Sequence, residues 1–302
     1  MDLSAPSAIS IDGGTCTKDG LCARVCPARI FRFEKGKVPS VERAHEYVLC
    51  GQCLSACIPG AIAHSKLDPK DLRKIEHPRP AGEDALLAFL RQRRSVREYR
   101  KKPVPQELLQ RVAEMAGYAP VGAFGGAGWI RHVTVVEGEE KMKAVRDATV
   151  RYMRKLHDLM SGFFLRGMAR FSEEARSGLS TLPDLKMRLA EYEAGRDAIL
   201  YDAPAAVFVS AGYETTTPHE DCDAALMNMM LAAHALGLGT CWNGWLGNAA
   251  LASHVRGPRE LGDLLGLSET HRVVEAFTVG WPSIPLHSVP YRETSIQIGG
   301  AS

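Results

Sequence analysis

The sequence lacks the features that would place the chain in a membrane or export it. No stretch approaches the roughly eighteen consecutive apolar residues that a membrane-spanning helix needs. The N-terminal segment MDLSAPSAISIDGG has no basic region followed by an apolar core, so it does not read as a signal peptide. We therefore expect a cytoplasmic protein with no membrane partner.

The sequence also has little excess charge. Its 37 Lys and Arg against 35 Asp and Glu leave a formal net charge of +2, which is too small to favour nucleic acid. The basic run at 91–102 contains Tyr99 but no further aromatic side chain on which bases would stack. Nucleic acid is therefore not an expected partner.

Cysteine is scarce over most of the chain and concentrated at one end. Six of the eight cysteines lie between residues 16 and 57. In a reducing compartment, such crowding favours metal ligation over disulfides. The other two, Cys222 and Cys241, lie in or beside apolar helical stretches and are expected to be ordinary buried thiols.

The clustered cysteines form two groups with related spacing. The groups read Cys16-x5-Cys22-x3-Cys26-Pro27 and Cys50-x2-Cys53-x3-Cys57. A bacterial two-cluster ferredoxin uses C-x2-C-x2-C-x3-C-P, in which the fourth cysteine ligates the other cluster. Residues 9–64 resemble such a ferredoxin, with CPARIF and CIPGAI ending the two halves. The resemblance implies one iron–sulfur site made by Cys16, Asp19, Cys22 and Cys57, and another made by Cys26, Cys50 and Cys53.

The second site departs from the ferredoxin pattern. Tyr47 stands where its remaining ligand is expected, and the proline expected after Cys57 is displaced to Pro59. The site is then incomplete, labile, three-iron, or capped by a neighbour such as His45. Structural zinc bound by two C-x3-C pairs is the alternative, but it leaves Cys16 and Cys50 unused.

The length of 302 residues suits two domains. We expect a ferredoxin-like domain at 1–65, a linker with three prolines at 66–82, and a larger domain at 83–302. In the larger domain, apolar periodicity and β-branched runs predict helices at 84–94, 106–116 and 221–236 and strands at 131–136, 205–210 and 273–279. Residues 139–201 are predicted to be mostly helical, with a break at 177–183. Few strands among many helices indicate the α+β class.

A dense basic motif, Arg93-Arg94-Ser95-Val96-Arg97, follows the first of these helices. Arginine supplies charge and a planar fork, and serine supplies a compact hydroxyl, so the motif suits a phosphate. The alternative is a solvated helix end, where arginines favour the helix dipole. The glycine-rich loop at 122–128 lacks G-x-G-x-x-G and follows a helix, so no Rossmann site is expected.

Four segments resemble, in order, the flavin-dependent nitroreductase family. They are RRSVREYRKKPVP from Arg93, YAP from Tyr118, DAALMNMMLAAHALGLGTCWNGW from Asp223, and VGWPSIPLHSVPYR from Val279. Together they extend the resemblance over nearly all of residues 83–298. The resemblance implies a central antiparallel sheet wrapped by helices, bound FMN, and a homodimer with each flavin at the subunit interface.

The resemblance also implies roles for matched positions. The FMN phosphate would be held by Arg93, Arg94, Ser95, Arg97 and, from the C-terminal arm, Arg292. The ring system would contact Pro120, Val121 and Gly122 of the partner subunit, and Trp242, Asn243 and Gly244. Backbone amides near Asn243 and Gly244 would face the flavin N5 edge, where a donor stabilises the reduced ring. Where the family has serine and asparagine, this chain has Val121 and Phe124. The alternatives are a ring held more by apolar contact, a reshaped pocket, or a low affinity for flavin.

The sequence thus predicts an FMN-dependent oxidoreductase that takes electrons through its iron–sulfur module. The acceptor would be a small electron-poor molecule such as a nitroaromatic, a quinone or an activated alkene. The donor would be NAD(P)H or reduced ferredoxin. No catalytic side chain is demanded, because the cofactor does the chemistry. The alternatives are a flavin-dependent dehydrogenase or reductive dehalogenase on the same fold, and a flavin-poor electron-transfer or sensing protein.

Overall fold

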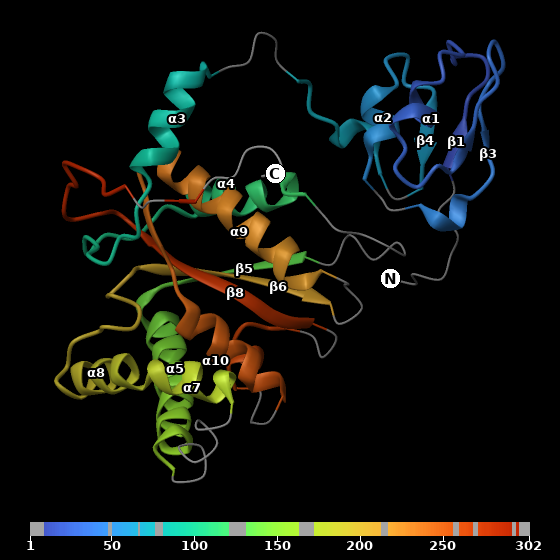
Figure 1. Cartoon of the computed structure of the whole chain (residues 1–302). Helices are drawn as coiled ribbons and strands as arrows, with labels where there is room; N and C mark the ends of the chain where they lie inside the picture. The colour runs from blue at the N-terminus through green and yellow to red at the C-terminus, as the bar shows by residue number, and fades with distance from the viewer. Residues whose placement is uncertain are drawn as a thin grey trace.

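A computed structural model of the chain (Figure 1) describes residues 9–47, 50–65, 67–75, 81–120, 131–162, 172–212, 217–255, 260–267, 271–291 and 294–295. The strands of these residues form two small antiparallel sheets near the N-terminus and one four-stranded antiparallel sheet in the rest of the chain. Among the helices of these ranges, none has the length and apolar character needed to cross a bilayer.

The N-terminal unit, residues 9–67, builds its small core around cysteines. Its elements are β1 (Ile9–Ile11), α1 (Leu21–Val25), β2 (Phe31–Arg32), β3 (Ser40–Val41), η1 (Ala44–Glu46), α2 (Gln52–Ala56) and β4 (Ile62–His64), with η2 (Pro69–Asp71) following. Strand β1 pairs with β4, and β2 pairs with β3. The buried residues are few, and three of them are cysteines: Cys22, Cys26, Ile30, Phe31, Tyr47, Cys53, Leu54 and Ile62.

The larger unit is a sheet in the order β5-β6-β8-β7 with helices on both faces. Its strands are β5 (Arg131–Glu137), β6 (Ala205–Gly212), β7 (Gly239–Trp242) and β8 (His271–Gly280). Its helices are α3 (Glu83–Gln92), α4 (Gln106–Glu114), η3 (Met115–Tyr118), α5 (Glu139–Ser161), α7 (Glu173–Ser180), α8 (Leu182–Glu193), α9 (Pro218–Ala235), α10 (Gly244–Val255) and α11 (Glu260–Leu264). All eight residues of β6 are buried, as expected for a central strand covered on both faces.

Alternation along the strands divides the interior into two cores. Ala206 and Phe208 of β6 pack with α5, α8 and α10 on one face. Val207 and Val209 of the same strand pack with α4 and α9 on the other face. Successive strand side chains point to opposite faces, so one strand serves both cores. Figure 1 shows α4 and α9 on one side of the sheet and α5 and α10 on the other.

The predicted elements of the larger unit are present, with differences that have simple causes. The expected break at 177–183 narrows to Thr181, because α7 continues to Ser180 and α8 begins at Leu182. Pro183 lies in the first turn of α8, where a missing backbone N–H costs nothing. Strand β7 and helix α10 were not predicted, since four residues are too few for a periodic signal and α10 is apolar on most sides.

The basic motif packs against the sheet edge at Gly239, where the Val96 side chain lies close to the glycine backbone. A Cβ added there would lie 2.6 Å from Cγ2 and 2.8 Å from Cβ of Val96. We expect Gly239→Ala to lower the free energy of unfolding by about 2 kcal/mol, and Val96→Ala in the same chain to restore part of that loss.

The control for this prediction is Gly178→Ala in α7. Nothing lies within 4 Å of an added Cβ at this position, so the substitution should raise stability by about 0.5–1 kcal/mol through helix propensity. Urea unfolding measures the free energy of unfolding of Gly239→Ala, of the double variant with Val96→Ala, and of Gly178→Ala. Equal destabilisation by the two glycine substitutions would contradict the close approach at β7.

Candidate functional site

The basic motif runs alongside β7 immediately after α3 ends. Ser95 forms a parallel bridge with Thr240, and the amide of Val96 donates to the Thr240 carbonyl at 2.9 Å. This pairing fixes the backbone of the motif at the sheet edge. It holds the side chains of Arg93, Arg94, Ser95 and Arg97 within one short extended segment.

The motif carries concentrated positive charge, because three of its five residues are arginines. Nη1 of Arg93 and Nε of Arg94 are both shielded from solvent without a hydrogen-bond acceptor among the described residues. Burial, and then the charge of Arg94, lower the pKa of Arg93. The Arg97 guanidinium lies 6.0 Å from the centre of the Tyr201 ring. Buried donors beside like charges could hold an anion.

The C-terminal arm reaches this site. Nη2 of Arg94 donates to the Pro290 carbonyl at 2.8 Å, although the two residues are 196 positions apart. Arg292, predicted to close on the phosphate, lies outside the described residues, as do Val121, Gly122 and Phe124. Pro290 thus brings the described end of the arm to the basic motif.

Pro120, the described part of the predicted flavin loop, is held by an arginine that the sequence did not single out. Arg131 donates to the carbonyls of Pro120 at 3.3 Å, Ala119 at 3.1 Å and Asp221 at 3.0 Å. The contacts join the exposed Pro120 to the start of α9. Burial lowers the pKa of Arg131. Arg131 is the first residue of a β-branched strand, and nothing in the local sequence predicts that it holds the loop at Pro120.

Trp242 lies two residues beyond Thr240 on β7, so the strand connects it to the basic motif. Since a strand rises about 3.3 Å per residue, the aromatic side chain is roughly 7 Å along from the bridge to Ser95. The indole Nε1 donates to Oε2 of Glu275 at 2.6 Å, and the side chain remains partly exposed. Burial, chiefly, raises the pKa of Glu275. The sequence predicted Trp242 but missed Glu275, which fixes its ring.

Asn243 and Gly244 differ in what they can offer a ligand. The main-chain N–H of Asn243 already donates to the Ala276 carbonyl at 2.9 Å. Its side-chain Nδ2 donates to the Ile199 carbonyl at 2.6 Å. Its Oδ1 accepts from the Leu246 amide and caps α10. Gly244 is the first residue of α10, so its amide has no intrahelical acceptor. Of the two predicted flavin donors, Gly244 is therefore the one whose position leaves its amide for a ligand.

Asn243→Ala should lower the free energy of unfolding by about 2–4 kcal/mol. The substitution removes a helix cap and leaves the Ile199 carbonyl buried without its donor. Asn248→Ala, on the exposed side of α10, is the matched control and should change stability by less than about 0.5 kcal/mol. The denaturant concentration at the unfolding midpoint measures the stability of both variants. Similar midpoints for Asn243→Ala and Asn248→Ala would refute the capping role.

The Cys-rich unit repeats its local structure after 31 positions. Gly20 and Gly51 precede α1 and α2 with the same left-handed φ of 69°. Cys22 and Cys53 are the second residues of these helices, and Cys26 and Cys57 follow their last residues. In this repeat, Cys16 of the first half corresponds to Tyr47 of the second, and Asp19 corresponds to Cys50. Two halves with one backbone pattern are what the ferredoxin resemblance predicts.

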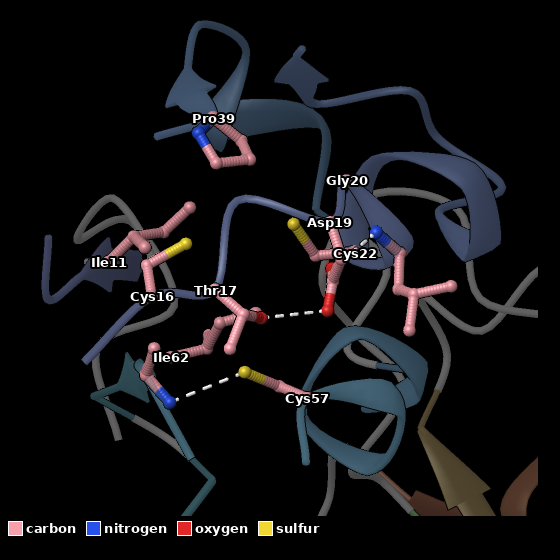
Figure 2. Close-up of a pocket in the computed structure, with 11 residues that line it drawn as sticks. Ile11, Cys16, Thr17, Asp19, Gly20, Cys22, Pro39, Cys57 and Ile62 are labelled. Atoms are coloured by element: carbon pink, nitrogen blue, oxygen red, sulfur yellow. Dashed lines mark hydrogen bonds between the residues drawn. The ribbon is translucent and has the colours of Figure 1, made fainter. Parts of the chain in front are cut away.

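The structure brings the predicted ligands of the first site together. A small pocket between the halves is lined by Cys16, Thr17, Asp19, Cys22 and Cys57, among others. Figure 2 shows the three sulfur atoms and the Asp19 carboxylate around this space. Hydrogen bonds from the Leu21 amide and the Thr17 hydroxyl lower the pKa of Asp19 and keep the carboxylate ionised. We name this group the first quartet: Cys16, Asp19, Cys22 and Cys57.

The remaining predicted ligands form a separate group. Burial first, and then Cys50 and Cys26, raise the pKa of Cys53 to about 11. The corresponding neighbours that raise the pKa of Cys22, after burial, are Cys16, Cys57 and Asp19. The thiols thus divide into the two predicted sets. We name the other set, with the residue that the repeat adds to it, the second quartet: Cys26, Tyr47, Cys50 and Cys53.

Within the described ranges, no three His, Cys, Asp or Glu side chains converge as one bound metal ion would require. Structural zinc needs four ligands at roughly 2.0–2.3 Å from one centre, whereas a cubane binds each thiolate through a different iron. His45, the proposed cap, is 75% exposed and has Nε2 3.7 Å from Glu46, so it is turned toward a carboxylate.

Comparison with known proteins identifies the larger unit. Residues 90–281 match the nitroreductase family. A nitroreductase with bound FMN from Bacteroides fragilis NCTC 9343 is 26% identical over 73% of this chain and 100% of that chain, with a TM-score of 0.51. No curated protein matches the chain.

Two further solved structures are more distant. A nitroreductase with bound FMN from Desulfitobacterium hafniense DCB-2 is 22% identical over 70% of this chain and 97% of that chain, with a TM-score of 0.49. A variant of an FMN and NADPH-dependent nitroreductase from sphigopyxis sp. strain HMH is 24% identical. The match covers 69% of this chain and 94% of that chain, with a TM-score of 0.47. With the family match spanning most of the chain, the protein belongs to the nitroreductase family.

Proposed function

We propose that the chain binds FMN on the basic motif and reduces a small electron-poor acceptor with electrons supplied through its N-terminal unit. The observation that carries the proposal is the set of shielded guanidinium donors at Arg93 and Arg94, which find no hydrogen-bond acceptor within the described part of the chain. A phosphate would satisfy these donors. Family membership and the FMN-bound relative from Bacteroides fragilis make FMN the cofactor of choice.

Each part of the proposed flavin site has a distinct task. Arg93, Arg94, Ser95 and Arg97, with Arg292, would hold the phosphate through charge-assisted hydrogen bonds. Trp242, fixed by Glu275, would present an apolar surface to the ring, and the Gly244 amide would donate to its N5 edge. Pro120, Val121 and Gly122 would contact the ring of the partner subunit. When bound, FMN supplies hydride and single-electron chemistry.

The N-terminal unit would carry iron–sulfur clusters on the two quartets. The first quartet offers three thiols and an ionised carboxylate around one pocket, a donor set that suits iron. The proposed boundaries are 1–65 for this domain, 66–82 for the linker and 83–302 for the flavin domain. Fusion of the two domains would make electron delivery intramolecular.

The exposed apolar surface of the flavin domain fits a homodimer. No residue of α3 is buried, and Leu86, Leu87 and Leu90 are all exposed. Ile284 and Leu286 of the C-terminal arm are exposed as well. Exposed leucines along one helix suit a protein partner, and a second copy of this chain is the partner that the family resemblance implies. The proposed donor is NAD(P)H at the flavin or reduced ferredoxin at the clusters. The proposed acceptor is a nitroaromatic, a quinone or an activated alkene.

Cofactor analysis of protein isolated without oxygen tests the proposal. We expect about one FMN per chain, together with iron and sulfide in near-equal amounts. Flavin absorbance near roughly 450 nm should lie over a broad shoulder near roughly 400 nm. A shoulder without flavin would favour the electron-transfer alternative, and protein that takes up neither cofactor on reconstitution would end the proposal.

A further inference from the structure

Tyr47 makes the two halves of the N-terminal unit unlike. The 31-residue repeat places it at the position of Cys16 in the first quartet. Cys16 is half-buried and lines the pocket between the halves, whereas Tyr47 is 2% exposed and belongs to the small core. One backbone position therefore carries a ligand in one half and a large packed side chain in the other.

The Tyr47 ring is held firmly where it lies. Its centre is 4.6 Å from that of the His64 ring, and Nδ1 of His64 accepts a hydrogen bond from the Leu67 amide at 3.0 Å. The Tyr47 hydroxyl is shielded from solvent, and its nearest polar neighbours include the Gly51 backbone and the Cys53 thiol. The buried ring therefore brings the phenol oxygen next to Cys53.

The length of the side chain decides what it can do there. A phenol reaches several ångströms further from the backbone than a thiol does. The Tyr47 ring fills space in the small core, whereas the corresponding Cys16 of the other half lines a pocket. The second quartet keeps three thiols, of which Cys26 and Cys53 are buried and Cys50 is exposed. Three thiolates are enough for three irons and leave a fourth without a protein ligand.

We propose that the second quartet holds a three-iron cluster, with the Tyr47 ring filling the corner that a fourth iron would take. This inference rests on the proposed function, and it makes the first quartet the four-iron site. The whole chain would then carry about four plus three, or about seven, irons. The two clusters would differ in ligands, charge and surroundings, which are the quantities that set reduction potential.

Iron and sulfide content of the full chain, isolated without oxygen, tests the proposal together with electron paramagnetic resonance. The native chain should hold about seven irons and show the paramagnetic signal of an oxidised three-iron cluster. Tyr47→Cys supplies the missing thiol, so it should raise the content to about eight irons and abolish that signal. Tyr47→Phe keeps the ring and removes the oxygen, and it should stay at about seven irons with the signal unchanged.

Two results would overturn the three-iron assignment while leaving the proposed function standing. One is a native chain with about eight irons that loses one in Tyr47→Phe, because the phenol oxygen would then be a ligand. The other is a native chain with about four irons and no three-iron signal, which would mean an empty second quartet. A native chain that takes up no iron at all would overturn the proposed electron entry itself.

Discussion

Arg93→Ala is expected to weaken FMN binding on the order of 100-fold and to stabilise the FMN-free protein at the same time. The guanidinium is partly buried, Arg94 is a like charge beside it, and Nη1 has no acceptor in the ranges that the structure describes. In the FMN complex these donors gain a phosphate, and hydrogen bonds to a charged group contribute about 1.5–3 kcal/mol each. Without FMN, the same charge is buried and uncompensated, so its removal should add about 1 kcal/mol to the free energy of unfolding.

The opposite signs make this prediction specific. FMN fluorescence titration measures the dissociation constant, and thermal unfolding of FMN-free protein measures stability. Arg91→Ala is the matched control, since Arg91 is exposed in the last turn of α3 and should change neither quantity appreciably. Arg93→Lys keeps the charge but loses the planar fork, and it should restore only part of the affinity. Unchanged FMN affinity in Arg93→Ala would remove the phosphate site from this motif.

Cys22→Ala should release the iron of the first quartet and unfold much of the N-terminal unit while FMN content stays the same. The unit buries few residues, and three of those are cysteines. The core of a domain of fewer than about 70 residues rarely supplies more than about 3–5 kcal/mol, so a bound metal or a cross-link adds a large share of its stability. Iron bound to the quartets would therefore supply much of the folding free energy of the unit.

Hydrogen exchange read by peptide measures this effect. Protection of residues 9–64 should fall by at least about 100-fold in Cys22→Ala, as expected when binding energy is folding energy. Protection of β6 and α9 should stay as in the native chain. Cys222→Ala is the control, because Cys222 is fully buried in the flavin domain and lies outside both quartets. If the exchange pattern of the N-terminal unit were the same in both variants, iron could not be what holds it.

Local rules predicted the larger elements because their signals are strong. Continuous apolar residues predict β6, which lies at the centre of the sheet, and the α+β class follows from few strands among many helices. Ordered motifs were enough to indicate the nitroreductase family, which the comparison confirms. The spacing of the cysteines also predicted the two sets of neighbours that the structure brings together. The cofactors on those residues stay a prediction.

Other features depend on distant contacts that no local pattern encodes. Strand β7 has only four residues, and its pairing with Ser95 joins segments 145 positions apart. The role of Arg131 depends on the carbonyls of Ala119, which follows η3, and of Asp221 in α9. Glu275 accepts a hydrogen bond from the Trp242 indole because the sheet register brings the two side chains together. These contacts follow from tertiary packing, which sequence spacing alone does not specify.

Rapid mixing of the fully reduced protein with less than one equivalent of a nitroaromatic acceptor, without oxygen, tests whether the N-terminal unit delivers electrons to the flavin. We expect flavin absorbance to return first and then to bleach again as cluster absorbance rises, at a rate independent of protein concentration. Such a phase is intramolecular electron delivery from the N-terminal unit to the flavin. Cluster absorbance that never changes, or a second phase that speeds up with protein concentration, would rule out this route.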